Sequence, residues 1–203
     1  MTRAPGPGPA GPRAGDPGAG AAGAARQMLR GLDAVTRVMA YASGALFLLV
    51  SLYIAADAVG RTFFGISSAV TDEFGGYALG VGGMWALAHT LRVGAHVRID
   101  ILLPYLPARM QVALNYTALA CMALFAAMLA AYTWKLALES LAGDARAMSF
   151  LRTPLFPPQA LIAIGLTMLA VEALALLAVG VAESVRAGRL VSPEGFSPPA
   201  EPS

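Results

Sequence analysis

Glu172 is the ionisable residue with the most unusual position, near the centre of the long apolar stretch 160–182. A carboxyl group within a hydrocarbon layer is costly, so an acid at such a position is by default a functional candidate, for instance as a proton carrier. Its helical neighbours, such as Met168 and Ala175, include no second titratable group that could complete a proton relay. A hydrogen bond to a partner helix and a protonated side chain facing lipid therefore remain open beside proton carriage.

A second polar group contains both histidines of the chain. His89, Arg92 and His96 are spaced i, i+3, i+7, and Asp100 follows four residues later. The three basic side chains share one face if a helix continues through this region. Haem in a helical bundle usually takes axial ligands from opposing sides, and the chain has no HExxH motif or cysteine cluster for zinc. We therefore expect no metal and no cofactor, and a polar edge cluster that contacts lipid headgroups or a partner.

Four further charged residues flank the first and second apolar stretches. Asp57 and Arg61 are spaced i, i+4 with the acid first, the order that favours an ion pair on a helix. Asp72 and Glu73 open the second stretch, where acids complement the positive end of a helix. Capping and anchoring explain all four residues. The sequence shows no Ser/His/Asp set and no Walker motif, so we expect neither catalysis nor ATP hydrolysis.

The elements that position these residues are four apolar stretches, at about 38–56, 74–91, 112–134 and 160–182. Each is long enough to cross the hydrocarbon core as a helix, and only helices and closed barrels satisfy their backbone groups in lipid. Hydrophobic residues make up 57% of the chain and charged residues 13%, which agrees with a membrane protein. The sequence therefore predicts an all-α integral membrane protein with four transmembrane helices.

The flanking segments have a different composition. Residues 1–25 form a Gly, Pro and Ala tract and residues 187–203 a Pro-rich tail, and we expect both to be disordered. Between them, 26–186 form one membrane domain. Residues 27–37 fit a short interfacial amphipathic helix, or equally a continuation of the first span. The first apolar run is longer than a usual signal-peptide core, which favours an uncleaved anchor over a cleaved signal peptide.

Basic residues near the span ends predict the orientation. Eight arginines lie on the side of the two termini, against four Lys or Arg on the other side, which favours cytoplasmic termini. These basic residues are tied to the membrane edges and the net charge is only +2, so nucleic-acid binding is not expected.

Two segments have the composition of contact surfaces. The second stretch contains Gly76, Gly80, Gly82 and Gly83, and small residues at such spacing let another helix approach closely. The connection 135–159 combines apolar and basic residues, and exposed patches of this kind often mark protein contacts. Its apolar side chains could instead enter the membrane interface while the arginines meet headgroups. The residues concerned are Arg146, Met148, Phe150, Leu151, Arg152 and Phe156.

Several motifs follow one another in a fixed order along the chain: Arg61 to Gly65, Glu73 with Tyr77, Gly82 with Gly83, Leu91 to Pro107, and Leu151 to Pro158. In this order they resemble the small permease subunit of tripartite ATP-independent periplasmic (TRAP) transporters. The resemblance covers about residues 35–182, and its strongest matches are His96, Asp100 and Pro107. The family often places a Trp about one turn after the tyrosine at 77, whereas Trp85 comes later here.

The resemblance implies a non-catalytic subunit of the bacterial inner membrane that braces a large permease. That permease would carry the substrate and sodium sites, and a periplasmic solute-binding protein would deliver an organic acid anion. The four glycines and Glu172 would then contact the large permease, and the 135–159 connection would dock the binding protein. Two other functions remain open: a small proton-coupled exporter that uses Glu172, and a haem-binding anchor of a redox complex that uses His89 or His96.

Overall fold

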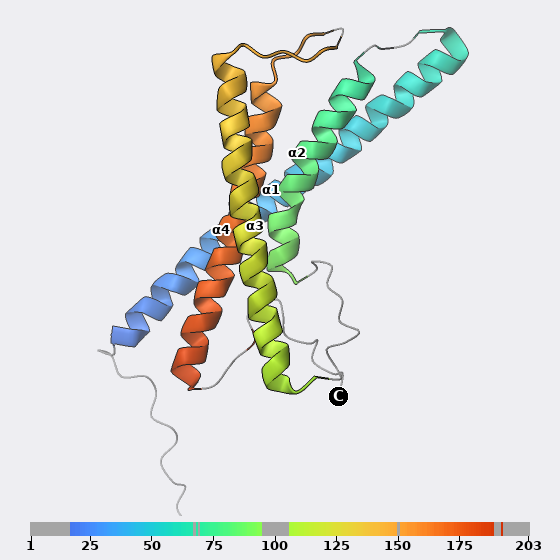
Figure 1. Cartoon of the computed structure of the whole chain (residues 1–203). Helices are drawn as coiled ribbons and strands as arrows, with labels where there is room; N and C mark the ends of the chain where they lie inside the picture. The colour runs from blue at the N-terminus through green and yellow to red at the C-terminus, as the bar shows by residue number, and fades with distance from the viewer. Residues whose placement is uncertain are drawn as a thin grey trace, which may run out of the picture.

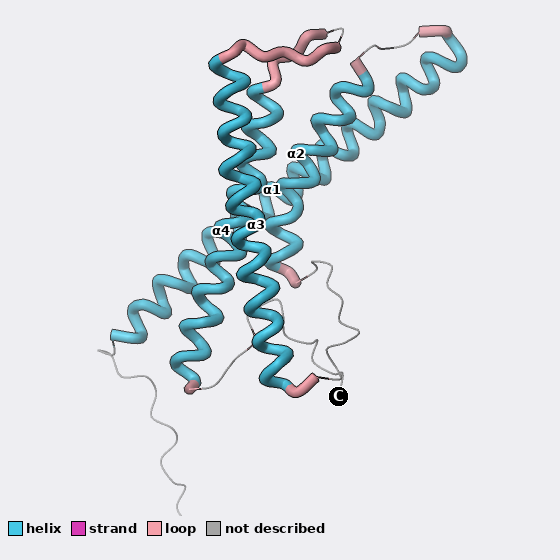
Figure 2. Tube along the Cα trace, viewed as in Figure 1, coloured by secondary structure: helices cyan, strands magenta, loops and turns pink. Residues whose placement is uncertain are grey.

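The structure is a computed structural model that describes residues 17–66, 68, 70–94, 106–149, 151–188 and 192. These residues form four α-helices and no named strand (Figure 2). The helices are α1 (Pro17–Phe64), α2 (Thr71–Arg92), α3 (Ala108–Ala142) and α4 (Phe156–Ala187). The expected all-helical class is confirmed.

The helices form two antiparallel pairs that cross each other (Figure 1). Helix α1 packs along α2, α4 packs along α3, and the two pairs meet where α2 packs on α4. Away from the crossing the pairs diverge, so the arrangement is more open than the regular bundle that four consecutive spans suggest. The start of α1 and the end of α4 lie at the same end of the molecule.

Helix α1 is much longer than the expected span 38–56. It begins at Pro17, inside the segment 1–25 for which we expected disorder, and it continues without a break to Phe64. Residues 27–37 are thus part of α1 and do not form a separate interfacial helix. Ala187, the first residue of the expected C-terminal tail, is the last residue of α4. Residues 1–16, 189–191 and 193–203, where we also expected disorder, lie outside the described residues.

Local sequence explains where the shorter helices begin and end. Helix α2 ends at Arg92, and Gly94 follows with a φ of 69°, a left-handed conformation that glycine adopts without strain. Helix α4 begins with Phe156 followed by two prolines, which are tolerated in a first turn because its N–H groups have no partner within the helix. The helical face expected to join His89, Arg92 and His96 therefore ends before His96.

Three of the helices are long and apolar enough to cross a membrane, over Leu29–Phe64, Arg109–Ala142 and Phe156–Ala187. Helix α2 does not reach that apolar content, because its glycines and its polar terminal turns lower it. Its 22 residues nevertheless give a length of about 33 Å, close to the thickness of the hydrocarbon core. A fourth crossing by α2 stays a prediction.

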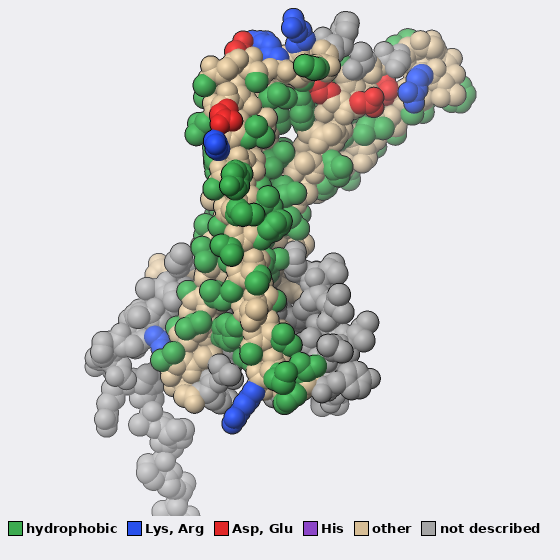
Figure 3. Space-filling view, viewed as in Figure 1, with side chains coloured by type: hydrophobic (Ala, Val, Ile, Leu, Met, Phe, Trp, Pro, Cys, Tyr) green, Lys and Arg blue, Asp and Glu red, His purple; other side chains and the backbone are tan. Residues whose placement is uncertain are grey.

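Small residues form the centre of the core. Alanines of α2, α3 and α4, with Leu91, Leu119 and Leu176, make up most of the buried cluster at the crossing. Large apolar side chains instead cover the outer faces of α1 and α3, among them Leu48, Leu52 and Leu124. In Figure 3 this apolar surface extends along the middle of the molecule, and the charged side chains gather towards its two ends. That distribution suits a molecule surrounded by lipid.

Candidate functional site

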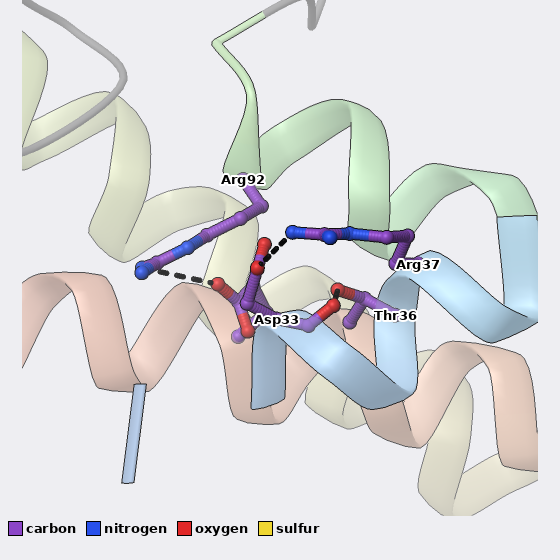
Figure 4. A network of polar contacts seen from close by, with 5 residues as sticks. Asp33, Thr36, Arg37 and Arg92 are labelled. Atoms are coloured by element: carbon purple, nitrogen blue, oxygen red, sulfur yellow. Dashed lines mark hydrogen bonds and ion pairs between the residues drawn. The ribbon is translucent and has the colours of Figure 1, made fainter. Parts of the chain in front are cut away.

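A buried ion pair joins α2 to α4. Arg92, the last residue of α2, places Nη1 3.5 Å from Oε1 of Glu172 in the middle of α4 (Figure 4). The Glu172 side chain is fully buried and the Arg92 side chain is 15% exposed. Removing one charge of such a pair is strongly destabilising, because the other charge then stays buried without its counter-ion. The pair therefore fixes the position at which α2 crosses α4.

Helix α1 adds a second ion pair at the same crossing. Arg37 Nη2 lies 2.6 Å from Asp33 Oδ2, and the buried Thr36 hydroxyl donates to the Asp33 carbonyl oxygen at 3.3 Å. Figure 4 shows these residues beside Arg92, whose counter-ion Glu172 lies on α4, so α1, α2 and α4 all contribute. The four formal charges cancel. We name these five residues the crossing cluster.

The burial of Glu172 corrects its expected role as a contact for the partner permease. Its carboxylate faces Arg92 of its own chain, and no part of its side chain reaches the outer surface. The sequence prediction left open a hydrogen bond from Glu172 to a partner helix but did not identify Arg92 as the partner. A useful signal was available: an acid within one span requires an opposite charge, and Arg92 lies at the end of another span.

Two of the four glycines expected to contact the partner lie inside the molecule. A Cβ at Gly82 would meet the Phe47 ring of α1 at 2.8 Å, and the buried Ser43 hydroxyl donates to the Gly82 carbonyl oxygen. A Cβ at Gly80 would meet Ile162 of α4 at 3.1 Å. Gly82 therefore serves the α1–α2 contact and Gly80 the α2–α4 contact.

Gly76 and Gly83 behave differently. A Cβ at either position would meet no heavy atom within 4 Å, so both lie on open faces of α2. They remain the candidates for contact with another chain.

The sequence prediction missed a glycine on α4. A Cβ at Gly165 would lie 2.9 Å from the Trp85 ring and 3.0 Å from the Met84 carbonyl carbon. The Trp85 indole N–H donates to the Leu161 carbonyl oxygen at 2.8 Å, which adds a polar contact to the same interface. This pairing depends on which helices are neighbours, and the sequence alone does not establish that.

At the opposite end of α1 from the crossing cluster, Asp57 stabilises the connection to α2. Its Oδ1 accepts the Ser68 backbone N–H at 2.7 Å, and the Ser68 hydroxyl lies 2.7 Å from the Tyr53 hydroxyl. The described residues include no ion pair between Asp57 and the exposed Arg61, so the i, i+4 pairing was wrong. Asp57 instead holds the connection between α1 and α2 through the Ser68 backbone N–H, and no described side chain caps the N-terminus of α2.

The connection between α3 and α4 is an ordered hairpin. We use the name α3–α4 hairpin for residues 145–149 and 151–155. The Ala147 N–H donates to the Thr153 carbonyl oxygen at 2.9 Å, and the Leu155 N–H donates to the Ala145 carbonyl oxygen at 3.0 Å. Two opposed backbone hydrogen bonds of this kind hold the two arms of the hairpin together.

The predicted docking residues occupy different positions on this hairpin. Met148 is fully exposed, Arg146 lies 3.2 Å from Asp144, and Arg152 is exposed with a φ of 50°. Phe156 belongs to the first turn of α4 and is half-buried. The structure therefore presents basic and apolar side chains together at the tip, as the composition suggested. Phe150, His96 and Asp100 lie outside the described residues.

Glu73 lies in the first turn of α2, before the expected span 74–91, and faces the hairpin. The Ser149 and Thr153 hydroxyls lower the pKa of its carboxyl group, against burial, which raises it. The Tyr77 hydroxyl donates to Oε1 of Glu73 at 3.0 Å. Asp72, its neighbour, is exposed. Only one of the two acids is therefore part of a contact between elements.

Among the described residues, no three His, Cys, Asp or Glu side chains gather as a metal site. An apolar recess of about 240 Å³ lies between α1, α2 and α4 and presents almost no polar surface. It is lined by Leu46, Val50, Phe74, Tyr77, Ala78, Val81, Pro157, Pro158 and Leu161.

These features define an integral membrane protein whose polar residues connect helices to one another. Residues 50–183 match the family described as tripartite ATP-independent periplasmic transporters, DctQ component. The match covers more than half of the chain, and the chain belongs to this family of transporter membrane subunits. The resemblance seen in the motifs is thereby confirmed. Comparisons with curated proteins and with solved structures gave no match.

Proposed function

We propose that this chain is the non-catalytic small subunit of a TRAP-type secondary transporter and braces a large permease in the bacterial inner membrane. The proposal rests mainly on the family match over residues 50–183. Both termini would lie in the cytoplasm, as the distribution of basic residues predicts. The crossing cluster and the glycine contacts hold the two helix pairs in one arrangement, and a fixed arrangement is what a scaffold requires.

The interior supports a role without substrate binding by this chain. The recess between α1, α2 and α4 offers an organic acid no cationic group, and its one hydroxyl, that of Tyr77, donates to Glu73. The positive charge of Arg92 is balanced by Glu172. An anion would therefore find no charge-assisted hydrogen bonds there, and these are the contacts that make carboxylate sites strong.

The substrate and its delivery belong to partner chains in this proposal. The large permease would hold the sodium and organic acid sites, and a periplasmic solute-binding protein would supply the anion. The exposed α3–α4 hairpin is the surface we assign to the binding protein. A small exporter that uses Glu172 as a proton carrier is less well supported, because this carboxylate is the counter-ion of Arg92.

Reconstitution tests the division of labour. The chain alone in liposomes should show no sodium-dependent uptake of organic acids, because its described interior has no anion site. Uptake should appear when the large permease and the binding protein are added. The measurement is uptake of a labelled organic acid under a sodium gradient. Robust uptake by the lone chain would refute the scaffold role.

Gly83 provides a test of the permease contact. We expect Gly83→Leu to leave the helix pairs intact, since a Cβ there meets no atom within 4 Å, yet to weaken association with the large permease at least tenfold. The measurement is co-purification of the permease with the tagged small subunit, together with the unfolding midpoint of the subunit alone.

Gly44 on α1 is the matched control, because a Cβ there also meets no atom within 4 Å. Gly44→Leu should retain the permease if the contact lies on α2. Co-purification of the permease with Gly83→Leu at unmodified yield would show that this face of α2 meets lipid.

A further inference from the structure

The α3–α4 hairpin reaches from the end of α3 and the beginning of α4 towards the beginning of α2 (Figure 1). Its two backbone hydrogen bonds fix its internal shape, and the Ala145 N–H donates to the Ser140 carbonyl oxygen at 2.9 Å, which ties the base of the hairpin to α3. The tip lies beyond these bonds, so a contact with another element would hold it further. Glu73 in the first turn of α2 faces the hairpin.

Three buried oxygens belong to the first turn of α2 and to the hairpin. Oε2 of Glu73 and the hydroxyl oxygens of Ser149 and Thr153 are shielded from solvent, and none of the three has a direct hydrogen bond of good geometry. Both hydroxyl groups are close enough to lower the pKa of the Glu73 carboxyl group. Hydroxyl groups are donors that rotate freely, so a small adjustment or one bridging water would satisfy all three atoms.

We infer that Glu73 is a positioning residue that fastens the α3–α4 hairpin to α2 through the Ser149 and Thr153 hydroxyls. The carboxylate is held from its other side by the Tyr77 hydroxyl at 3.0 Å, so its orientation is set by α2 itself. Hydrogen bonds to a charged acceptor are roughly twice as strong as neutral ones. A single acid can therefore hold a short hairpin in one direction.

The attachment has a consequence for delivery that rests on the proposed function. Met148 and Arg152 at the tip are exposed and can meet a binding protein only if the hairpin projects in a constant direction. A docking element that is ordered before the encounter loses less conformational entropy on binding. Release of the hairpin should therefore slow delivery without dissociating the small subunit from the permease.

A spin label at the tip measures the attachment directly. We would place a nitroxide at Met148→Cys in a Cys121→Ser background, because Cys121 is exposed, and record its mobility in the purified permease complex. Glu73→Ala should increase the mobility of the label several-fold. Unchanged mobility in Glu73→Ala would overturn the inference.

Asp72→Ala is the matched control, because Asp72 lies in the same turn, carries the same charge and is exposed. It should leave the mobility of the label unchanged, and an equal increase in both variants would overturn the specific role of Glu73. The double variant Ser149→Ala/Thr153→Val removes the donors and keeps the acid. It should reproduce the effect of Glu73→Ala, and it serves as the test if Glu73→Ala fails to assemble.

A second experiment tests whether the attachment of the hairpin matters for delivery. It measures organic acid uptake with the binding protein present, in complexes that carry no spin label. Glu73→Ala should reduce the uptake rate several-fold while the complex is recovered at normal yield. Increased mobility with unchanged uptake would overturn the delivery role and leave the attachment established. Absence of uptake in the unmodified complex would count against the proposed function, while the mobility result would still decide the attachment.

Discussion

Replacing Glu172 by alanine should destabilise the small subunit by about 3 kcal/mol, because Arg92 then remains buried without the carboxylate that lies 3.5 Å away. The expected result is a large fall in the unfolding midpoint in detergent and in the yield of the permease complex. Both follow from loss of the α2–α4 crossing, where the two helix pairs meet. The measurement is thermal unfolding of the purified subunit, with the yield of the complex recorded in parallel.

A surface pair provides the matched control. Lys135 and Glu139 on α3 lie 3.8 Å apart, but their side chains are 70% and 63% exposed. Glu139→Ala should change stability by less than about 0.5 kcal/mol, because exposed pairs are screened by solvent. Similar losses for Glu172→Ala and Glu139→Ala would show that burial does not determine the strength of the Arg92 pair.

The double variant Arg92→Leu/Glu172→Leu tests whether an unbalanced charge causes the loss. It should recover much of the stability lost in Glu172→Ala, since apolar replacement of a whole buried pair is often neutral. A double variant as unstable as the single one would indicate that the charges themselves specify the crossing. Leucine at position 172 fills space that alanine leaves empty. Comparing the double variant with Glu172→Ala therefore separates the loss of packing from the loss of charge.

The helical class and the segments 112–134 and 160–182 could be predicted because apolar length is a local property of the chain. Both segments lie inside α3 and α4. The length of α1 was harder to predict. Its Gly, Pro and Ala tract has a composition typical of disorder, yet α1 begins at Pro17. Composition alone did not locate that helix start.

The partners of the site residues could not be predicted, because each contact joins segments that are distant in the chain. Glycine spacing correctly marked α2 as a packing surface, but which neighbour each glycine meets depends on the crossing of two helix pairs. Gly82 meets α1, Gly80 meets α4, and Gly83 is open, although all three lie within four positions. The Arg92 to Glu172 pair was missed for the same reason, since it joins different helices.

Gly165→Ala should be the most damaging single-methyl substitution at this crossing. Its Cβ would lie 3.0 Å from the Met84 carbonyl carbon, and a backbone atom cannot move aside as a flexible side chain can. The expected loss is about 2 kcal/mol, even though alanine favours a helix interior over glycine by about 1 kcal/mol. The measurement is the unfolding midpoint of the subunit in detergent.

Gly83→Ala is the matched control, because it adds the same methyl group to a helical glycine with no atom within 4 Å. It should be neutral or slightly stabilising through helix propensity alone. Fluorescence of Trp85 in a Trp134→Phe background reports the contact itself, since Trp85 donates to the Leu161 carbonyl oxygen at 2.8 Å. Its emission should change in Gly165→Ala and stay constant in Gly83→Ala. A midpoint for Gly165→Ala equal to that of Gly83→Ala would mean that α2 and α4 can separate without cost, and the crossing would then not be the fixed part of the scaffold.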